Sequence, residues 1–202
     1  GVGSGNTPII FDESCDIKVA VSSVIHSKTF DNGTICASEQ SVIVDASIYE
    51  EVKQEFRARK AYIAEGEELV KLKKIVLGAN GSMNAKLVGR PAIEIAQEAG
   101  FEVPADTKLI IGEATSTDIS EPLAHEKLFP LLSMYKADDL DDAVDKADEL
   151  VQGGGIGHTA GIYIDVVNNQ EKLTEFENRM KACRILVNTP SAQGGIGDIY
   201  NF

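Results

Sequence analysis

Short runs of β-branched and aliphatic residues alternate with helical patterns along the chain, and this alternation restricts the possible folds more than any other feature. Strands joined by such helices pair in parallel, because the crossover helix returns the chain to the same end of the sheet. We therefore predict the α/β class, with three α/β/α layers and a mostly parallel sheet covered on both faces. The pattern places strands at 41–45, 108–112, 128–135, 161–164 and 184–188, and helices at 14–28, 47–61, 66–77, 91–99, 139–152 and 169–182.

Local signals refine several helices. Ser14 or Asp16 is available as the N-cap of the first helix, and Ser47 with Glu50 has the form of a capping box. In the segment 138–149 the apolar residues form one stripe and the acidic residues lie opposite. The acidic side is therefore predicted to be a solvated helix face.

The charge balance excludes several classes of partner. The 202 residues include 19 Lys and Arg against 32 Asp and Glu, which leaves a formal charge of −13. Such a charge repels phosphate backbones and anionic lipids, so neither nucleic acid nor membrane is expected as a partner. No apolar run approaches the ~20 residues that span a bilayer and no leader opens the chain, so we predict a cytoplasmic protein. No repeat or linker divides residues 1–202, which favours one domain.

Cysteine and histidine are few and widely spaced. Cys15, Cys36 and Cys183 include no C-x-x-C pair, and no second histidine completes an H-E-x-x-H motif after His125. Neither a disulfide scaffold nor a metal site is therefore predicted. Cys15 and Cys183 fall in helical patterns and are expected to be structural.

Glycine spacing at the start of the chain invites a comparison with dinucleotide-binding turns. Gly1-x-Gly3-x-Gly5 lacks the G-x-G-x-x-G form and the preceding strand that such a turn requires, so a closely packed entry loop is the favoured interpretation. The glycines within 153–157 follow a helical pattern and precede a strand, which is typical of a helix C-cap and a tight turn.

Cys36 lies in a different context from the other cysteines. Residues 29–39 show no clean period and contain a turn signal at Asn32-Gly33, so they are predicted to form a loop. A loop of this kind can expose a thiolate and direct backbone N–H groups at a neighbouring oxyanion. From the residues alone, Cys36 is either a nucleophile or a structural loop cysteine.

The segment 30–41, FDNGTICASEQS, closely resembles the active-site cysteine segment of CoA-acylating aldehyde dehydrogenases, a group that includes one half of bifunctional aldehyde-alcohol dehydrogenases. The resemblance continues through 120–128, 157–161 and 188–197, and so covers essentially the whole chain. It implies a catalytic domain of the aldehyde dehydrogenase type over residues 1–202. A cofactor-binding domain of the Rossmann type would precede it in the parent protein and be absent here.

The resemblance also implies a reaction. The Cys36 thiolate would attack a short-chain aldehyde to give a thiohemiacetal, and hydride would leave for NAD. Coenzyme A would then release the acyl group from the Cys36 thioester as acyl-CoA. The expected ligands are therefore the aldehyde, acyl-CoA, NAD as cofactor and coenzyme A as co-substrate.

Two more residues receive roles through the resemblance. His158 matches a histidine close to the cysteine and is expected to accept a proton from Cys36 or from the CoA thiol. Glu126 resembles the glutamate of an E-x-F-G-P segment that binds the nicotinamide ribose, with Phe129 where glycine is usual. Gly1 aligns with the carboxylate that activates water in hydrolytic relatives, which favours CoA as the acyl acceptor.

Two alternatives stay open at this point. The chain is a domain of a hydrolytic aldehyde or semialdehyde dehydrogenase, or it is a fragment that acts mainly as an oligomerisation module. A homo-oligomer formed through this domain is expected for the full-length protein. The isolated chain, without the cofactor-binding domain, is expected to show little or no dehydrogenase activity.

Overall fold

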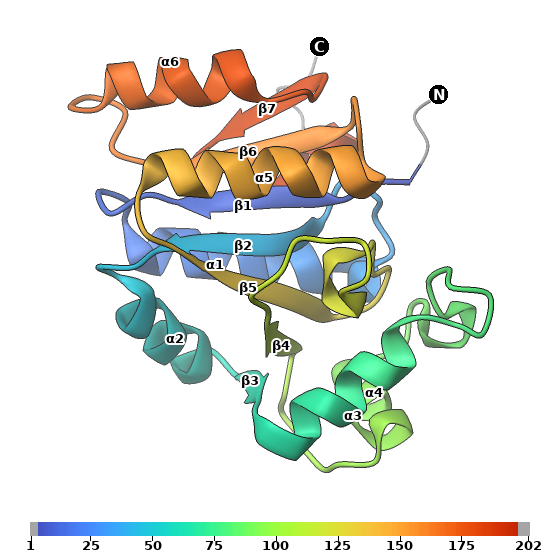
Figure 1. Ribbon diagram of the computed structural model, residues 1–202. Coiled ribbons are helices and arrows are strands. Elements are labelled where there is room, and N and C mark those ends of the chain that lie inside the picture. Colours follow the sequence, from blue (N-terminus) through green and yellow to red (C-terminus); the bar gives the residue numbers. More distant parts are fainter. Residues whose placement is uncertain (1–3, 198–202) are drawn as a thin grey trace.

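A computed structural model describes residues 4–197 and shows one parallel sheet with helices packed on both faces (Figure 1). Its seven strands lie in the order β3-β4-β5-β2-β1-β6-β7, and every neighbouring pair is parallel. The predicted α/β class and three-layer arrangement are confirmed. The strands are β1 (Thr7–Phe11), β2 (Glu39–Asp45), β3 (Ala61–Ala64), β4 (Leu109–Glu113), β5 (Leu131–Ala137), β6 (Thr159–Tyr163) and β7 (Arg184–Val187).

The helices divide between the two faces of the sheet. One apolar cluster joins the sheet to α1 and α2, and a second joins it to α3, α4, α5 and α6. No helix within residues 4–197 is long and apolar enough to cross a membrane. The α-helices are α1 (Ile17–Thr29), α2 (Tyr49–Ala58), α3 (Gly66–Val76), α4 (Ala92–Ala99), α5 (Leu140–Gly154), α6 (Gln170–Arg179) and α7 (Ser191–Ile196), and the 3-10 helices are η1 (Phe30–Gly33), η2 (Ala85–Leu87) and η3 (Pro122–Ala124).

Alternating side chains of the inner strands supply the two clusters. In β2, Ile43 packs on the side of α3 to α6, whereas Val42 and Val44 pack on the side of α1 and α2. All three side chains are fully buried. Because successive residues of a strand point to opposite faces, a strand covered by helices on both sides reads as a continuous apolar run.

Two strands were missed by the sequence patterns. β1 lies inside the sheet between β2 and β6, directly after the glycine-rich segment for which the sequence predicts a loop. β3 occupies Ala61–Ala64 and therefore begins at the last residue of the helix predicted over 47–61. That helix stops at Ala58, and Lys60 adopts a positive φ of 71° that reverses the chain into β3.

The helix caps agree with the sequence in part. Asp16 caps α1 by accepting a hydrogen bond from the Val19 N–H. The capping box expected at Ser47 was wrong, because Ile48 occupies the N-cap of α2 and the Ser47 hydroxyl bonds to Asp45 instead.

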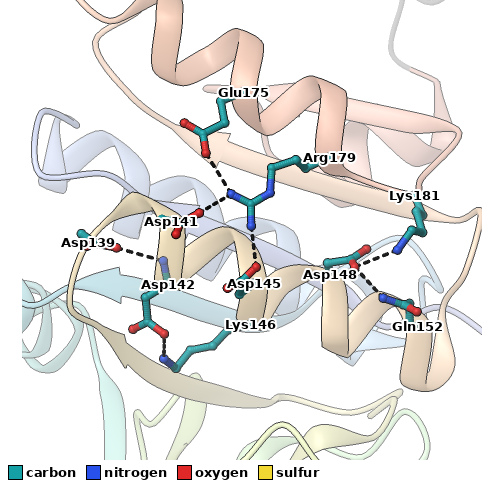
Figure 2. Close-up of polar contacts among 10 residues, drawn as sticks. All are labelled: Asp139, Asp141, Asp142, Asp145, Lys146, Asp148, Gln152, Glu175, Arg179 and Lys181. Atoms are coloured by element: carbon teal, nitrogen blue, oxygen red, sulfur yellow. Dashed lines mark hydrogen bonds and ion pairs between the residues drawn. The ribbon is translucent and has the colours of Figure 1, made fainter.

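The acidic side of α5 is exposed, as predicted, and it is also paired with cations at the end of α6 and just after it (Figure 2). Arg179 donates to Asp141 and to Asp145, each at 2.5 Å, and Lys181 lies 2.9 Å from Asp148. These pairs hold α6 beside α5 above the sheet. Exposed ion pairs of this type contribute roughly 0–1 kcal/mol each to stability.

Candidate active site

The candidate residues lie in one row at the amino end of the parallel strands. Glu126 precedes β5, Cys36 precedes β2, Gly5 precedes β1, His158 precedes β6, and Arg184 begins β7. These five strands are consecutive neighbours in the sheet. Residues far apart in the sequence therefore meet at the same end of the strands, and the order of the strands in the sheet fixes the order of these residues.

Cys36 lies at the tip of a tight loop. Asp31, Asn32 and Gly33 all adopt positive φ values, 47°, 48° and 77°, which confirms the turn signal in the sequence. A second turn over 35–38 is closed by the Ser38 N–H donating to the Ile35 carbonyl at 2.9 Å. The Cys36 side chain is exposed, and its backbone N–H donates no hydrogen bond within residues 4–197.

Gly5 joins the cysteine loop to His158. A Cβ atom at Gly5 would lie 2.2 Å from the Cys36 carbonyl oxygen and 3.3 Å from His158 Cε1. The backbone of Gly5 is therefore packed directly between the two. This confirms the closely packed loop for Gly5. Gly1 and Gly3 lie outside the described residues, as does the alignment of Gly1 with the water-activating carboxylate.

The His158 imidazole is 3% exposed and lies among polar neighbours. Its Nδ1 is 3.0 Å from Thr159 Oγ1, and the same oxygen accepts a hydrogen bond from Arg184 at 3.0 Å. Burial and the positive charge of Arg184 lower the pKa of His158 below its usual value. The imidazole is therefore neutral at physiological pH.

Glu126 stands at the edge of a cleft of about 510 Å³. Its Oε1 accepts a hydrogen bond from the Gly5 N–H at 2.8 Å, and burial raises the pKa of its carboxyl group. The cleft is also lined by residues of the 81–83 loop, by His125 and by the end of α5. Gly5 thus contacts all three residues singled out by the resemblance, Cys36, His158 and Glu126.

Two buried lysines beneath this row were missed by the sequence patterns. The Lys28 Nζ donates to the Lys127 carbonyl at 2.7 Å and to Gln40 at 3.3 Å. The Lys127 Nζ donates to the Leu123 and His125 carbonyls at 2.8 and 2.6 Å. Both side chains are fully buried, so the helix leading to the cysteine loop is tied to the segment that carries Glu126.

The same segment accommodates Phe129 without disturbing the loop above it. The Phe129 side chain is fully buried, and a Cβ atom at Gly33 would lie 2.9 Å from the Phe129 carbonyl oxygen. The cysteine loop therefore rests directly on the backbone of this segment.

Lys28 gives stability a specific pH dependence. Burial lowers the pKa of Lys28 to about 7, whereas an unfolded lysine titrates near ~10.4. Above pH 7 the unfolded chain binds more protons than the folded chain at this site, so the free energy of unfolding rises with pH. We expect Lys28 to contribute a rise of about 1–2 kcal/mol between pH 7 and 8.5, measured by urea unfolding.

Lys28→Met is expected to remove the contribution of Lys28 to this rise in the free energy of unfolding. The contribution of Lys127, whose pKa is also lowered by burial, should remain. Lys18→Met on the exposed side of the same helix is the matched control and should retain the full slope. An identical slope in Lys28→Met and the wild type would contradict the prediction.

The other two cysteines do not lie in helices, contrary to the sequence patterns. Cys15 precedes α1 and is half-buried, and Cys183 lies between α6 and β7 and is exposed. Burial, together with Asp12 and Asp16, raises the pKa of the Cys15 thiol to about 12. The Cys183 Sγ donates to the His158 carbonyl at 3.2 Å. Both patterns failed at the ends of helices, where periodicity carries the least information.

Here an exposed cysteine lies beside a buried histidine at the amino ends of parallel strands. A cysteine paired with a histidine is an arrangement found in thiol-dependent acyl-transfer enzymes. Residues 3–197 match the aldehyde dehydrogenase family, and the chain belongs to this family.

Relatives of known name agree with that assignment. The chain is 55% identical over its full length to the bifunctional aldehyde-alcohol dehydrogenase AdhE of Escherichia coli, of which it spans 23%. A crystal structure of an acetylating aldehyde dehydrogenase from Geobacillus thermoglucosidasius superposes with a TM-score of 0.93 at 42% identity, over 98% of this chain and 43% of that one.

A propionaldehyde dehydrogenase from Rhodopseudomonas palustris, crystallised with bound CoA and an acylated cysteine, gives a TM-score of 0.85 at 27% identity, over 98% of this chain and 44% of that one. The chain thus spans less than half the length of each of these relatives.

Proposed function

We propose that this chain is the cysteine-bearing catalytic domain of a CoA-acylating aldehyde dehydrogenase, which interconverts a short-chain aldehyde and its acyl-CoA with NAD. The observation that carries the proposal is the packing of Gly5 between the exposed Cys36 loop and the buried His158. The acetylating relatives support CoA as the acyl acceptor and do not favour the hydrolytic alternative.

Cys36 is the proposed nucleophile. Its thiolate forms a bond to the carbonyl carbon of the aldehyde, and the electron pair of the C=O bond moves to oxygen. The Cys36 N–H, which donates no hydrogen bond among the described residues, is proposed to donate to the resulting oxyanion. After oxidation the acyl group is held on the Cys36 sulfur as a thioester, which conserves its activation for transfer.

His158 is the proposed partner of this sulfur. It is neutral and packs against the same glycine as the Cys36 carbonyl. Its imidazole assists either by accepting a thiol proton or by donating a hydrogen bond to a thiolate or an oxyanion. When the CoA thiolate attacks the thioester, its sulfur forms a bond to the acyl carbon, the bond from that carbon to the Cys36 sulfur breaks, and Cys36 leaves as a thiolate.

Glu126 is proposed to bind the nicotinamide ribose. One carboxylate oxygen is held by the Gly5 N–H, which leaves the other free to accept hydrogen bonds from hydroxyl groups in the cleft of about 510 Å³. The residues present therefore fit a polar, hydroxyl-bearing ligand. The bound nicotinamide would supply the hydride acceptor.

A smaller pocket supports a short acyl chain. It measures about 220 Å³ and is lined by Phe30 of the cysteine loop, His26 of α1 and Ile196 of α7. A Cβ atom on Gly195 of α7 would lie 2.3 Å from the Cβ atom of Ala37, so this helix packs against the residue that follows Cys36.

The three thiols are expected to differ in reactivity towards iodoacetamide. Cys36 is exposed, whereas the raised pKa of Cys15 leaves little thiolate and the Cys183 Sγ is engaged with a carbonyl group. Cys36 should be alkylated first, and Cys15 at least about a hundredfold more slowly at pH 7.5. Peptide mass mapping of partially alkylated protein measures this order. Equal labelling of the three would remove the argument for an activated Cys36.

Acyl transfer tests the proposed function directly. Incubation of the 202-residue chain with acetyl-CoA should place one acetyl group on Cys36, visible by intact mass and peptide mapping. NADH formation from acetaldehyde and CoA should be negligible for the chain alone and appear when it is joined to a nicotinamide-binding domain. CoA-independent aldehyde oxidation by that longer protein would favour a hydrolytic enzyme instead.

We also propose that the full-length protein is a cytoplasmic homo-oligomer that associates through this domain. β7 is an edge strand of the sheet, and its four residues are only partly buried. Unpaired edges of this kind favour association with another chain. Light scattering that finds only monomers of the full-length protein would refute this assembly and leave the thiol chemistry unaffected.

A further inference from the structure

Thr159 lies between a cation and an imidazole, and its hydroxyl group has one proton to donate. The Arg184 guanidinium carries only hydrogen-bond donors, so its bond to Thr159 occupies a lone pair of Oγ1. Within residues 4–197, the remaining partner of this hydroxyl is His158 Nδ1, at 3.0 Å. Donation from Oγ1 to Nδ1 gives the hydroxyl proton an acceptor and leaves a lone pair of Oγ1 for Arg184.

We propose that Arg184 and Thr159 are positioning residues that hold His158 as the neutral tautomer with its proton on Nε2. His158 would then serve the sulfur chemistry as a hydrogen-bond donor and not as the acceptor of a thiol proton. This inference rests on the proposed function for its catalytic meaning, but the tautomer itself is a property of the chain alone.

The surroundings of His158 favour the neutral form. The Arg184 guanidinium lies next to His158 through its bond to Thr159, and the Arg184 N–H and the Cys183 thiol both donate to the His158 backbone carbonyl. On the opposite side Gly5 separates its ring from the Cys36 carbonyl and binds the Glu126 carboxylate. A neutral Nε2–H stabilises negative charge on sulfur or oxygen without itself changing charge between pH 7 and 8.

The other two histidines provide internal references for an NMR test. His26 Nδ1 lies 2.9 Å from the Ser22 carbonyl, and His125 Nε2 lies 2.7 Å from the Ile119 carbonyl. Since a carbonyl group only accepts, His26 should show the Nδ1–H pattern and His125 the Nε2–H pattern in two-bond ¹H–¹⁵N spectra. His26→Gln and His125→Gln assign the signals.

Wild-type His158 is expected to share the pattern of His125 at pH 7.5. Thr159→Ser should preserve it because the hydroxyl remains, and Thr159→Val should shift it towards the Nδ1–H form. Arg184→Gln should raise the pKa of His158, because it removes a nearby positive charge, whereas Arg90→Gln on the exposed surface should leave it unchanged. An Nδ1–H pattern in the wild type, or an unchanged pattern in Thr159→Val, would overturn the proposal that Thr159 and Arg184 hold the Nε2–H tautomer.

Acetylation of Cys36 by acetyl-CoA separates this inference from the proposed function. Thr159→Val should slow acetylation about tenfold or more, with Thr159→Ser near the wild-type rate. A shifted tautomer with an unchanged acetylation rate would refute the positioning role. No acetylation in the wild type would refute the proposed function and leave the tautomer result standing.

Discussion

Replacing Cys36 by alanine is expected to abolish acetyl transfer from acetyl-CoA to the chain, with a loss of about 10⁴-fold or more in rate. Removal of a covalent nucleophile has an effect of this size because no other group forms the intermediate. The remaining two thiols offer no substitute, since Cys15 is half-buried and Cys183 bonds to a carbonyl group. Intact mass spectrometry over a time course measures the transfer.

The control for this variant is Cys183→Ala, which removes another exposed thiol and should acetylate close to the wild-type rate. The Cys36 side chain is exposed, so its truncation should change the free energy of unfolding by no more than about 0.5 kcal/mol. A Cys36→Ala protein that still acquires an acetyl group on Cys183 would show that acetylation depends on the exposure of a thiol and not on an active site.

Gly5→Ala is the second change with a large expected effect. The added Cβ atom would lie 2.2 Å from the Cys36 carbonyl oxygen, a distance that forces backbone to move. Overpacking of this type costs about 1–3 kcal/mol. Because the displaced backbone carries the nucleophile, we expect acetylation of Cys36 to fall at least about tenfold, a larger effect than the loss of stability explains.

Gly153→Ala is the matched control. Gly153 lies in α5 with no heavy atom within 4 Å of its would-be Cβ, so alanine should stabilise the helix by about 0.5–1 kcal/mol. Its acetylation rate should equal that of the wild type. If Gly5→Ala keeps both its stability and its acetylation rate, Gly5 does not set the position of the cysteine loop.

Sequence patterns predicted the layers of the fold but not the position of its first strand. Pro8 lies within this strand, although proline cannot donate to the ladder. In the structure the register between β1 and β2 shifts between Thr7 and Pro8, and this irregularity accommodates the missing N–H. The order of strands followed from no local signal, because it depends on pairings between distant segments.

At the site, the resemblance supplied Cys36, His158 and Glu126, and their proposed roles still await the experiments above. Gly5, which contacts all three, was anticipated only as a closely packed residue. The burial of Lys28 can be predicted from its spacing. Lys28 follows Val24 and Ile25 at helical spacing, which places it on the buried stripe of α1. A charged residue on an apolar stripe indicates a buried hydrogen-bonded group, which composition alone does not reveal.

The position of β1 has a consequence for biosynthesis. This strand pairs with β2 early in the chain and with β6 near its end. Contacts between such distant segments form slowly, because a long loop must close first. During translation the Cys36 loop is made well before His158 emerges, so the thiol spends that interval outside its finished surroundings. A nascent chain of this topology is most exposed to oxidation or misfolding until β6 has left the ribosome.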